Sequence, residues 1–328
     1  MATYCKRFLL CLLCITCLVL PLSSCSKYRE EKSTAEQARV VATVGDYEVR
    51  QELIDFFYFN YRTEIDGGDT GVWQGPQADE YHEKLLRRVA DAVGDLYGIF
   101  ALSASYGIDP FGERIDRLLS ARIETVIDSF DTRRDYIAHL ESLHMTDAVY
   151  RFLTRSYVCR EEMLSASQGV GSTADEDLLA FCRSEDVFCM LSLTVSFGDG
   201  MRAWAEERAA QLEAMLAEKP SDAGFLQVAR QSATAHSAGT YVTLRQYRLL
   251  VGDGEARPAR GDTTAPLFDR DQFMILRCAE KSETYVLERS SDILLSYMEY
   301  KTEQYAVAYA QELCASQTYM ALSRSDLA

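Results

Sequence analysis

The feature that most limits the fold of this 328-residue chain is a series of long stretches in which apolar residues recur every three or four positions. This spacing places them on one face of a helix, and such a helix buries that face against its neighbours. The stretches end at glycine and proline, as at Gly107 and Pro110, because proline disfavours helix in the residue before it. The pattern predicts helices over residues 51–62, 78–106, 113–130, 133–143 and 147–165. We therefore expect residues 40–165 to form a mainly helical domain.

A different pattern occupies the middle of the chain. Residues 187–195 form an apolar run without helical spacing, which is typical of a buried strand. Shorter patterns follow and predict helices over 200–218 and 225–232 and strands within 239–242 and 272–277. They indicate a small α+β domain over 183–280. A linker over 166–182, rich in glycine and serine at 168–173, separates it from the helical domain.

Two further elements frame the helical domain. The β-branched run Val40–Val44 ends at Gly45-Asp46 and is followed by Tyr47-Glu48-Val49, which predicts a short hairpin. No glycine or proline interrupts the apolar repeat from about Ser290 to Leu322, and we expect one long helix there, within a C-terminal segment 286–325. The fold class is therefore expected to be mainly α with a small α+β part.

The N-terminal residues read as an export signal. Lys6 and Arg7 precede an apolar run from Phe8 to Leu22, which is too short for a comfortable membrane span and contains a proline near its end. The sequence Leu22-Ser23-Ser24-Cys25 resembles the lipobox of bacterial lipoproteins, which implies removal of residues 1–24, lipidation of Cys25 and a tether over 25–39. The alternatives are an ordinary secretory signal or an uncleaved anchor. All three place the remaining chain outside the cytoplasm, and the lipobox reading anchors it to a membrane through the lipid on Cys25.

The composition limits the partners. The chain carries 50 Asp and Glu against 34 Lys and Arg, a formal net charge of −16. A surface this acidic argues against binding nucleic acid or anionic lipid, since phosphate binding needs clustered cations. Membrane contact is then expected through the lipid. Outside the signal segment and Cys25, five widely spaced cysteines remain, which predicts no disulfide framework, although one bridge is possible. They are Cys159, Cys182, Cys189, Cys278 and Cys314.

No pattern indicates a metal, a cofactor or a hydrolase. His139 and His144 are five residues apart, not the three or four that bring two histidines onto one helix face. His236 lies in an apparent polar turn, and the chain has no GxSxG sequence to supply a nucleophilic serine. The segments 66–69 (Asp-Gly-Gly-Asp) and 252–254 (Gly-Asp-Gly) read as surface turns rather than calcium or phosphate loops.

The order of these parts resembles the SurA/PrsA-type extracytoplasmic foldases. The strongest likeness is Val41-Ala42-Thr43-Val44-Gly45-Asp46-Tyr47-Glu48-Val49 followed by an aromatic helix, and Tyr106-Gly107-Ile108 is similar to the family's helix end. The resemblance implies a chaperone lobe in which the segment 286–325 packs on 40–165, with a parvulin-type peptidyl-prolyl isomerase domain inserted between them. It also implies unfolded or nascent exported polypeptides as partners.

The inserted domain departs from the family where the chemistry should lie. Residues 225–232 and 239–242 resemble parvulin motifs, but parvulins carry a histidine on the first strand and another on the last, facing each other beneath the bound proline. Here Leu191 or Ser192, depending on register, and Met274 stand at those positions. The intervening helix between about 248 and 271 also looks absent. We expect a degenerate domain without isomerase activity; the alternatives are an active isomerase with a rearranged pocket and a non-catalytic envelope scaffold lipoprotein.

An aromatic run is the remaining candidate for function. Residues Phe56, Phe57, Tyr58, Phe59 and Tyr61 cover more than one helix face. We expect Tyr58 and Phe59 to lie at a rim or in a cleft, and Phe56, Tyr58, Phe59 and Tyr61 to form a candidate client-binding groove. Packing of all these rings against the C-terminal helix is the alternative.

Overall fold

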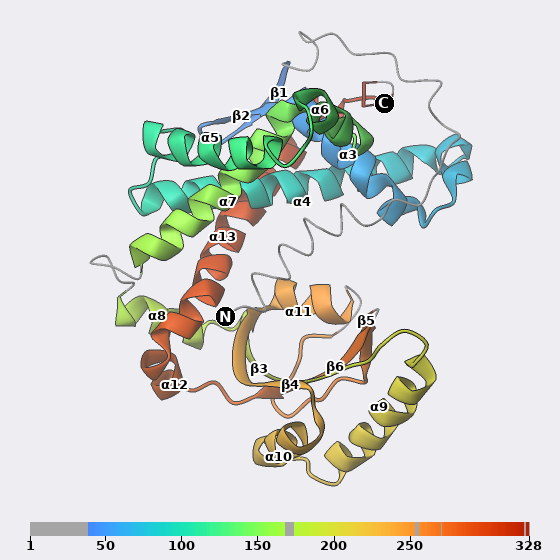
Figure 1. Ribbon diagram of the computed structural model, residues 1–328, viewed down its shortest axis with the longest axis vertical. Helices are drawn as coiled ribbons and strands as arrows, with labels where there is room; N and C mark the ends of the chain where they lie inside the picture. Colours follow the sequence, from blue (N-terminus) through green and yellow to red (C-terminus); the bar gives the residue numbers. More distant parts are fainter. Residues whose placement is uncertain (1–38, 168–173, 253–255, 270, 325, 328) are drawn as a thin grey trace. The chain divides into compact units, whose positions relative to one another are not determined.

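The computed structural model describes residues 39–167, 174–252, 256–269, 271–324 and 326–327 (Figure 1). The chain divides into two units: unit 1 is Met1–Met163 with Thr302–Ala328, and unit 2 is Leu164–Lys301. The described residues are mainly helical with a small antiparallel sheet part, so the predicted fold class is confirmed at this level. Residues 1–38, with the predicted signal segment and nearly all of the tether, lie outside the described residues, as do 168–173 of the predicted linker.

Unit 1 begins with the predicted hairpin. Strand β1 (Val40–Val44) pairs antiparallel with β2 (Tyr47–Arg50), and Gly45 at the turn has φ 54°, a conformation that favours glycine. Helix α3 (Gln51–Asp66) follows at once and ends at Gly67, whose left-handed backbone donates to the Thr63 carbonyl. The other elements of unit 1 are the 3-10 turn η1 (Thr70–Gln74), α4 (Ala78–Ser105), α5 (Glu113–Ile127), α6 (Arg133–Ser142), α7 (Asp147–Ser167), the end of α13 (Ser290–Ala315) and α14 (Gln317–Met320).

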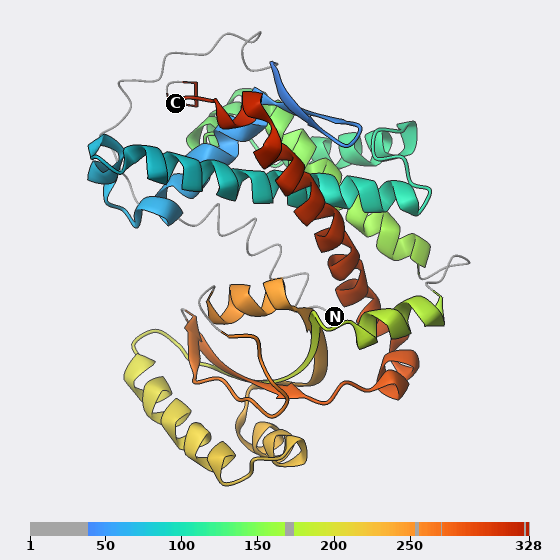
Figure 2. The same ribbon diagram turned by 180° about the vertical axis from the view of Figure 1, so that it is seen from behind.

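Helix α4 forms the centre of unit 1 and meets the C-terminal helix at unusually short range (Figure 2). Gly94 and Gly98, one turn apart on α4, face the backbone of α13: a Cβ on Gly98 would lie 2.8 Å from the Thr302 carbonyl oxygen, and one on Gly94 would overlap that of Ala306. The two glycines therefore permit a crossing that no larger side chain allows.

The sequence predicted one continuous C-terminal helix, but the structure has two helices separated by a break. Helix α13 ends at Ala315, and Ser316 takes an extended backbone and caps the short α14 by accepting from the Tyr319 amide. The break lets the buried Tyr319 donate its hydroxyl to the Leu86 carbonyl at 2.5 Å. The prediction relied on glycine or proline to mark a helix end. Here a serine ends the helix instead, so the break was missed.

Unit 2 contains a four-stranded antiparallel sheet in the order β4-β3-β6-β5. Helices α9 and α10 contact one face, and α11 covers the other with Tyr247 packed on Phe188, Met190 and Cys278 (Figure 1). Its strands are β3 (Val187–Ser196), β4 (Ala235–Thr243), β5 (Leu267–Asp269) and β6 (Gln272–Ala279), and its helices are α8 (Asp175–Arg183), α9 (Arg202–Ala217), α10 (Asp222–Ser232), α11 (Leu244–Val251) and α12 (Glu283–Glu288), with the start of α13.

Three details of unit 2 differ from the sequence expectation. Helix α11 was not predicted; it begins at the Thr243–Gln246 capping box and ends at Val251, so its first half precedes the 248–271 segment. Strand β4 begins at Ala235, so His236 lies on an exposed edge strand and not in a turn. The three-residue strand β5 was not predicted, because so short a segment carries no periodicity.

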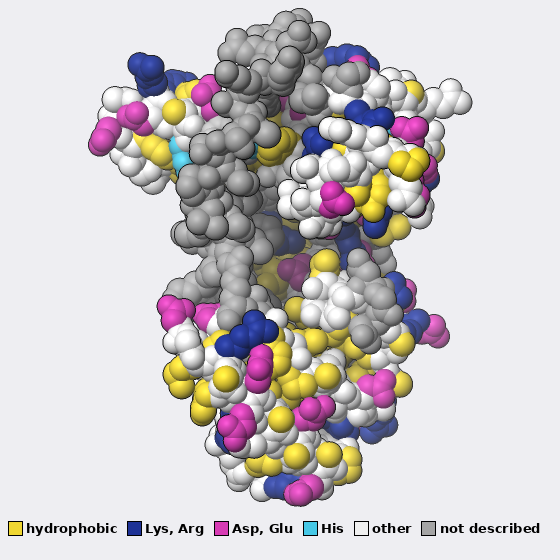
Figure 3. All heavy atoms as spheres, turned by 90° about the vertical axis from the view of Figure 1, so that its right-hand side faces the viewer, with side chains coloured by type: hydrophobic (Ala, Val, Ile, Leu, Met, Phe, Trp, Pro, Cys, Tyr) yellow, Lys and Arg dark blue, Asp and Glu magenta, His cyan; other side chains and the backbone are white. Residues whose placement is uncertain are grey.

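The surface of unit 2 is mixed. On the face turned to the viewer in Figure 3, hydrophobic and charged side chains are interspersed. Exposed apolar side chains of this unit include Met201, Trp204, Phe268 and Leu249. In the described part of the chain, every helix is too short or too polar to cross a membrane.

Candidate functional site

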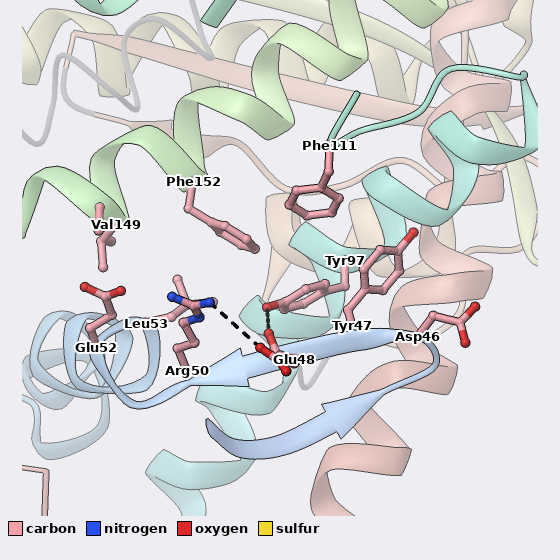
Figure 4. Close-up of a pocket in the computed structure, with 11 residues that line it drawn as sticks. Asp46, Tyr47, Glu48, Arg50, Glu52, Leu53, Tyr97, Phe111, Val149 and Phe152 are labelled. Carbon is pink, nitrogen blue, oxygen red and sulfur yellow. Dashed lines mark hydrogen bonds and ion pairs between the residues drawn. The ribbon is translucent and has the colours of Figure 1, made fainter. Parts of the chain in front are cut away.

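A pocket of about 410 Å³ lies in unit 1, and its walls come from segments far apart in the sequence (Figure 4). This volume lies within the range of about 300–1,000 Å³ that is usual for ligand pockets. One wall is made by the hairpin and the start of α3, with Asp46, Tyr47, Glu48, Arg50, Glu52 and Leu53. The other is made by α4, the loop before α5 and α7, with Tyr97, Phe111, Ala148, Val149 and Phe152.

Aromatic rings form the apolar part of the pocket. The ring centre of Tyr47 lies 5.3 Å from that of Tyr97 and 6.1 Å from that of Phe111, and the centres of Phe111 and Phe152 are 6.5 Å apart. Behind them the fully buried Phe100 contacts all four rings. Phe111 is 47% exposed, so part of this aromatic surface faces solvent. An exposed ring held by other rings keeps its orientation and can receive an apolar group.

Polar groups line the hairpin side. Tyr97 donates its hydroxyl to the Glu48 carbonyl oxygen at 2.6 Å, which fixes the ring against β2. The Glu48 carboxylate lies 3.8 Å from the Arg50 guanidinium, and the Glu52 carboxylate accepts from the Thr146 hydroxyl at 3.0 Å. The pocket thus combines an aromatic wall with three carboxylates and one guanidinium.

The two tyrosines of the pocket stay protonated near neutral pH. Burial, with the neighbouring Tyr309 hydroxyl as a smaller cause, raises the pKa of Tyr47 to about 12, and burial also raises the pKa of Tyr97. Neither phenol can act as a base there. No nucleophile held by a base lines the pocket, and the described residues contain no group of side chains suited to hold a metal ion.

The aromatic run of α3 lies elsewhere in unit 1. Phe56, Phe57 and Tyr58 are buried, so the expectation that Tyr58 sits at a rim is wrong. The Tyr58 hydroxyl bonds to Nδ1 of His82 at 2.7 Å, and Nε2 of His82 bonds to the Leu322 carbonyl, which turns the ring inward toward the C-terminal segment.

The other two candidate rings of α3 are more accessible. Phe59 is 46% exposed and its ring centre lies 3.6 Å from that of His144. Tyr61 is half-buried beneath the Arg88 guanidinium, 4.0 Å from the ring centre. None of the four predicted client-binding residues Phe56, Tyr58, Phe59 and Tyr61 lines the pocket.

The register of β3 and β6 shows which of the residues expected at parvulin-like positions share a face of the sheet. Ser192 pairs with Leu276 and Thr194 with Met274, so Ser192 and Met274 share one face of the sheet, and both are half-buried. Leu191 pairs with Arg277 and lies on the opposite face. Of the two alternatives, Ser192 shares a face of the sheet with Met274 and Leu191 does not.

The opposite face holds a buried arginine that the sequence did not single out. Arg277 is 8% exposed and donates to the Asp222 carboxylate at 2.7 Å, to the Gly261 carbonyl at 2.8 Å and to the Pro220 carbonyl at 2.5 Å. These acceptors come from the start of α10 and the segment before β5. Arg277 thus ties both to the sheet, which is a structural role.

The acidic turn at 66–69 and the described cysteines form no further candidate site. Asp66 accepts from the Gly68 amide and the Trp73 indole, and Asp69 from the Gly71 amide, so both carboxylates serve a turn. The five cysteines after Cys25 are free thiols. Cys25 and Asp253-Gly254 lie outside the described residues. No protein-family model and no curated protein matches this chain.

Proposed function

We propose that this protein is a lipid-anchored extracytoplasmic chaperone of the SurA/PrsA type. In this proposal unit 1 binds unfolded exported polypeptides through the aromatic pocket, and unit 2 is a degenerate parvulin-like domain without isomerase activity. The observation that carries the proposal is the pocket itself: an open, ring-lined cavity whose outermost ring, Phe111, is 47% exposed. Apolar walls of this kind accept unfolded segments through area and not through sequence.

Two features of the chain support the family part of the proposal. The C-terminal segment from Thr302 belongs to the same unit as the N-terminal helices, and the α+β unit is inserted between them, as the resemblance implies. In unit 2, β3 and β6 are neighbours with Ser192 and Met274 on one face, and in this proposal the two residues stand where parvulins carry histidines. Without imidazoles at these positions, the sheet lacks the polar floor on which the family's reaction depends.

The binding part is tested by closing the pocket without removing any of its contacts. Ala148 is exposed on α7 and lines the pocket, so Ala148→Trp should fill its mouth and leave the packing intact. We expect this variant of the full chain to lose most of its ability to suppress aggregation of a chemically unfolded enzyme on dilution.

A second pair of variants separates the pocket from general surface apolarity. Phe111→Ser removes a half-exposed ring from the pocket, and burial of that surface in a complex contributes about 1 kcal/mol, or roughly a fivefold loss of affinity. Leu118→Ser removes a similarly exposed side chain from α5, outside the pocket, and should have little effect. Equal suppression by all variants and the unaltered chain would refute the pocket as the binding site.

The anchor is tested separately. Cys25→Ala should abolish incorporation of a radiolabelled fatty acid and cause the uncut precursor to accumulate, because acyl transfer requires that thiol. Equal labelling of the variant and the unaltered chain would remove the lipoprotein assignment and leave the binding proposal intact.

A further inference from the structure

We propose that the pocket selects segments in which basic residues flank apolar ones. This inference deepens the proposed function and rests on it, since it names the class of polypeptide that unit 1 binds. The basis is the combination of aromatic rings and carboxylates around one cavity, together with the placement of each charge.

The carboxylates exceed the cations at the pocket. Asp46, Glu48 and Glu52 line it with one cation, Arg50. Among the described residues, only Glu48 of the three carboxylates has a cationic partner within 4.0 Å, namely Arg50 at 3.8 Å. Asp46 and Glu52 therefore remain available to a cation from a bound segment. A low-dielectric aromatic wall strengthens such an attraction relative to open solvent.

The positions of the two carboxylates are matched to an extended segment. Figure 4 shows Asp46 at one end of the hairpin wall and Glu52 at the other, with the rings of Tyr97 and Phe152 opposite the stretch between them. Residues 46 to 52 span at most about 20 Å, which an extended peptide covers in about six residues. A segment with one basic residue on each side of about three apolar ones would place charges at both ends and apolar groups against the rings.

The edge of the pocket already holds a cation in this manner. The Arg155 guanidinium lies 5.0 Å from the ring centre of Phe111 and forms an ion pair with Asp116 at 2.7 Å. A ring face and a carboxylate thus bind one guanidinium within the protein at the edge of the pocket. Cations over aromatic faces are attracted by the negative face of the ring.

The test uses three labelled peptides whose sequences differ at two positions only. The basic peptide is Ser-Gly-Lys-Leu-Phe-Leu-Lys-Gly-Ser; the neutral and acidic ones carry Gln or Glu in place of both Lys. Binding to the full chain is followed by fluorescence anisotropy. Exposed ion pairs are each worth a few tenths to about 1 kcal/mol, so we expect the basic peptide to bind roughly three- to tenfold tighter than the neutral one. This preference should shrink when salt is raised from about 0.02 M to about 0.5 M.

The charge-removed variant is Asp46→Asn with Glu52→Gln. Asp46 is exposed, and a glutamine at 52 still offers an oxygen to the Thr146 hydroxyl, so the pocket should stay folded. We expect this variant to bind the basic and neutral peptides equally, with unchanged affinity for the neutral one. The matched control, Glu64→Gln with Asp79→Asn, removes two exposed carboxylates that do not line the pocket and should keep the preference.

Each failure points to a different part of the account. Equal binding of the basic and neutral peptides by the unaltered chain, or a preference that persists in the charge-removed variant, would overturn the inference while leaving the proposed function in place. Absence of binding for all three peptides would overturn the proposed function itself.

Discussion

At the scale of single residues, phenylalanine has two different roles in unit 1: some rings line the pocket and others fill the core. Phe111 and Phe152 complete a pocket, whereas Phe56 and Phe57 are core residues of α3. The difference comes from the neighbours: Phe111 sits in a loop, where the Phe100 ring 5.3 Å away and the Arg155 guanidinium hold it, and it stays 47% exposed. A ring that is held in place and remains half exposed is suited to receive a partner.

Asp147 offers a test of the hydrogen bonding that positions α7. Burial alone would raise the pKa of this carboxyl, but hydrogen bonds from Tyr136 at 2.6 Å and Arg151 at 2.7 Å outweigh it and hold the pKa below its ordinary value of 3.8. A lowered pKa in the folded state stabilises the fold above the unfolded-state pKa, and this contribution is lost as pH falls through the folded-state pKa.

We therefore expect Asp147→Asn to lower the free energy of unfolding by about 1 kcal/mol at pH 7. The difference from the unaltered chain should shrink below about pH 4 and vanish at lower pH, as measured by urea unfolding across a pH series. Asp131→Asn, an exposed control just before α6, should show no such difference. A difference that stays constant down to pH 2 would contradict the proposed cause.

At the scale of elements, the helices of unit 1 were predictable because long apolar periodicities specify them. The elements that were missed are short: α11 has eight residues and β5 has three. The end of α13 at Ala315 was missed because Ser316 stops it without glycine or proline. Tyr58 was wrongly predicted to lie at a rim. The periodicity shows that α3 has a wide apolar face, but it does not show which ring a neighbour such as His82 will cover.

The pocket could not be predicted from the sequence at all. Its lining comes from the hairpin, α3, α4, α7 and the loop before α5, and no local pattern shows that Tyr47, Tyr97 and Phe152 will meet. The hairpin motif did direct attention to residues 41–49, but as a mark of family resemblance. The parvulin-like positions could be narrowed only to two, since a one-residue change of register exchanges the two faces of a strand.

The close crossing of α4 and α13 predicts that a glycine-to-alanine change in a helix lowers the free energy of unfolding, which is opposite to the usual effect. In an exposed helix, glycine to alanine favours folding by up to about 1 kcal/mol. At Gly94 the added Cβ would overlap the Ala306 carbonyl, and we expect Gly94→Ala to lower the free energy of unfolding by about 1–3 kcal/mol. Urea unfolding followed by circular dichroism measures it, with Ala104→Gly on the exposed part of α4 as the calibration of the propensity effect. A stability increase for Gly94→Ala would show that the helices do not cross this closely.

The β3–β6 pair makes a second prediction at this scale. In the proposed function this sheet lacks isomerase activity, so the full chain at micromolar concentration should leave the exchange of an X-Pro peptide at its uncatalysed time of tens to hundreds of seconds. Proline-coupled protease cleavage or NMR exchange measures the rate. An acceleration that disappears in Met274→Ala would promote the alternative of an isomerase with a rearranged pocket.

At the scale of the whole molecule, the two units differ in architecture and in the kind of surface they offer. Unit 1 is built from helices of the two ends of the chain and contains the ring-lined pocket; unit 2 is a small sheet with helices on both faces. The acidic net charge of −16 suits a protein that remains soluble while exposing apolar rings and that attracts basic segments over a distance. Binding of polypeptides in unit 1 is the central claim that joins these properties.

Site-specific photocrosslinking tests that claim most directly. A photoreactive phenylalanine analogue in place of Phe111, the exposed ring of the pocket, should capture an unfolded polypeptide during its dilution from denaturant. The same analogue at Ala210, exposed on α9 of unit 2, should capture little of it. We expect the product at position 111 to decrease when the basic peptide is added in excess. Equal capture at the two positions, or capture at position 111 that the peptide does not reduce, would contradict the account.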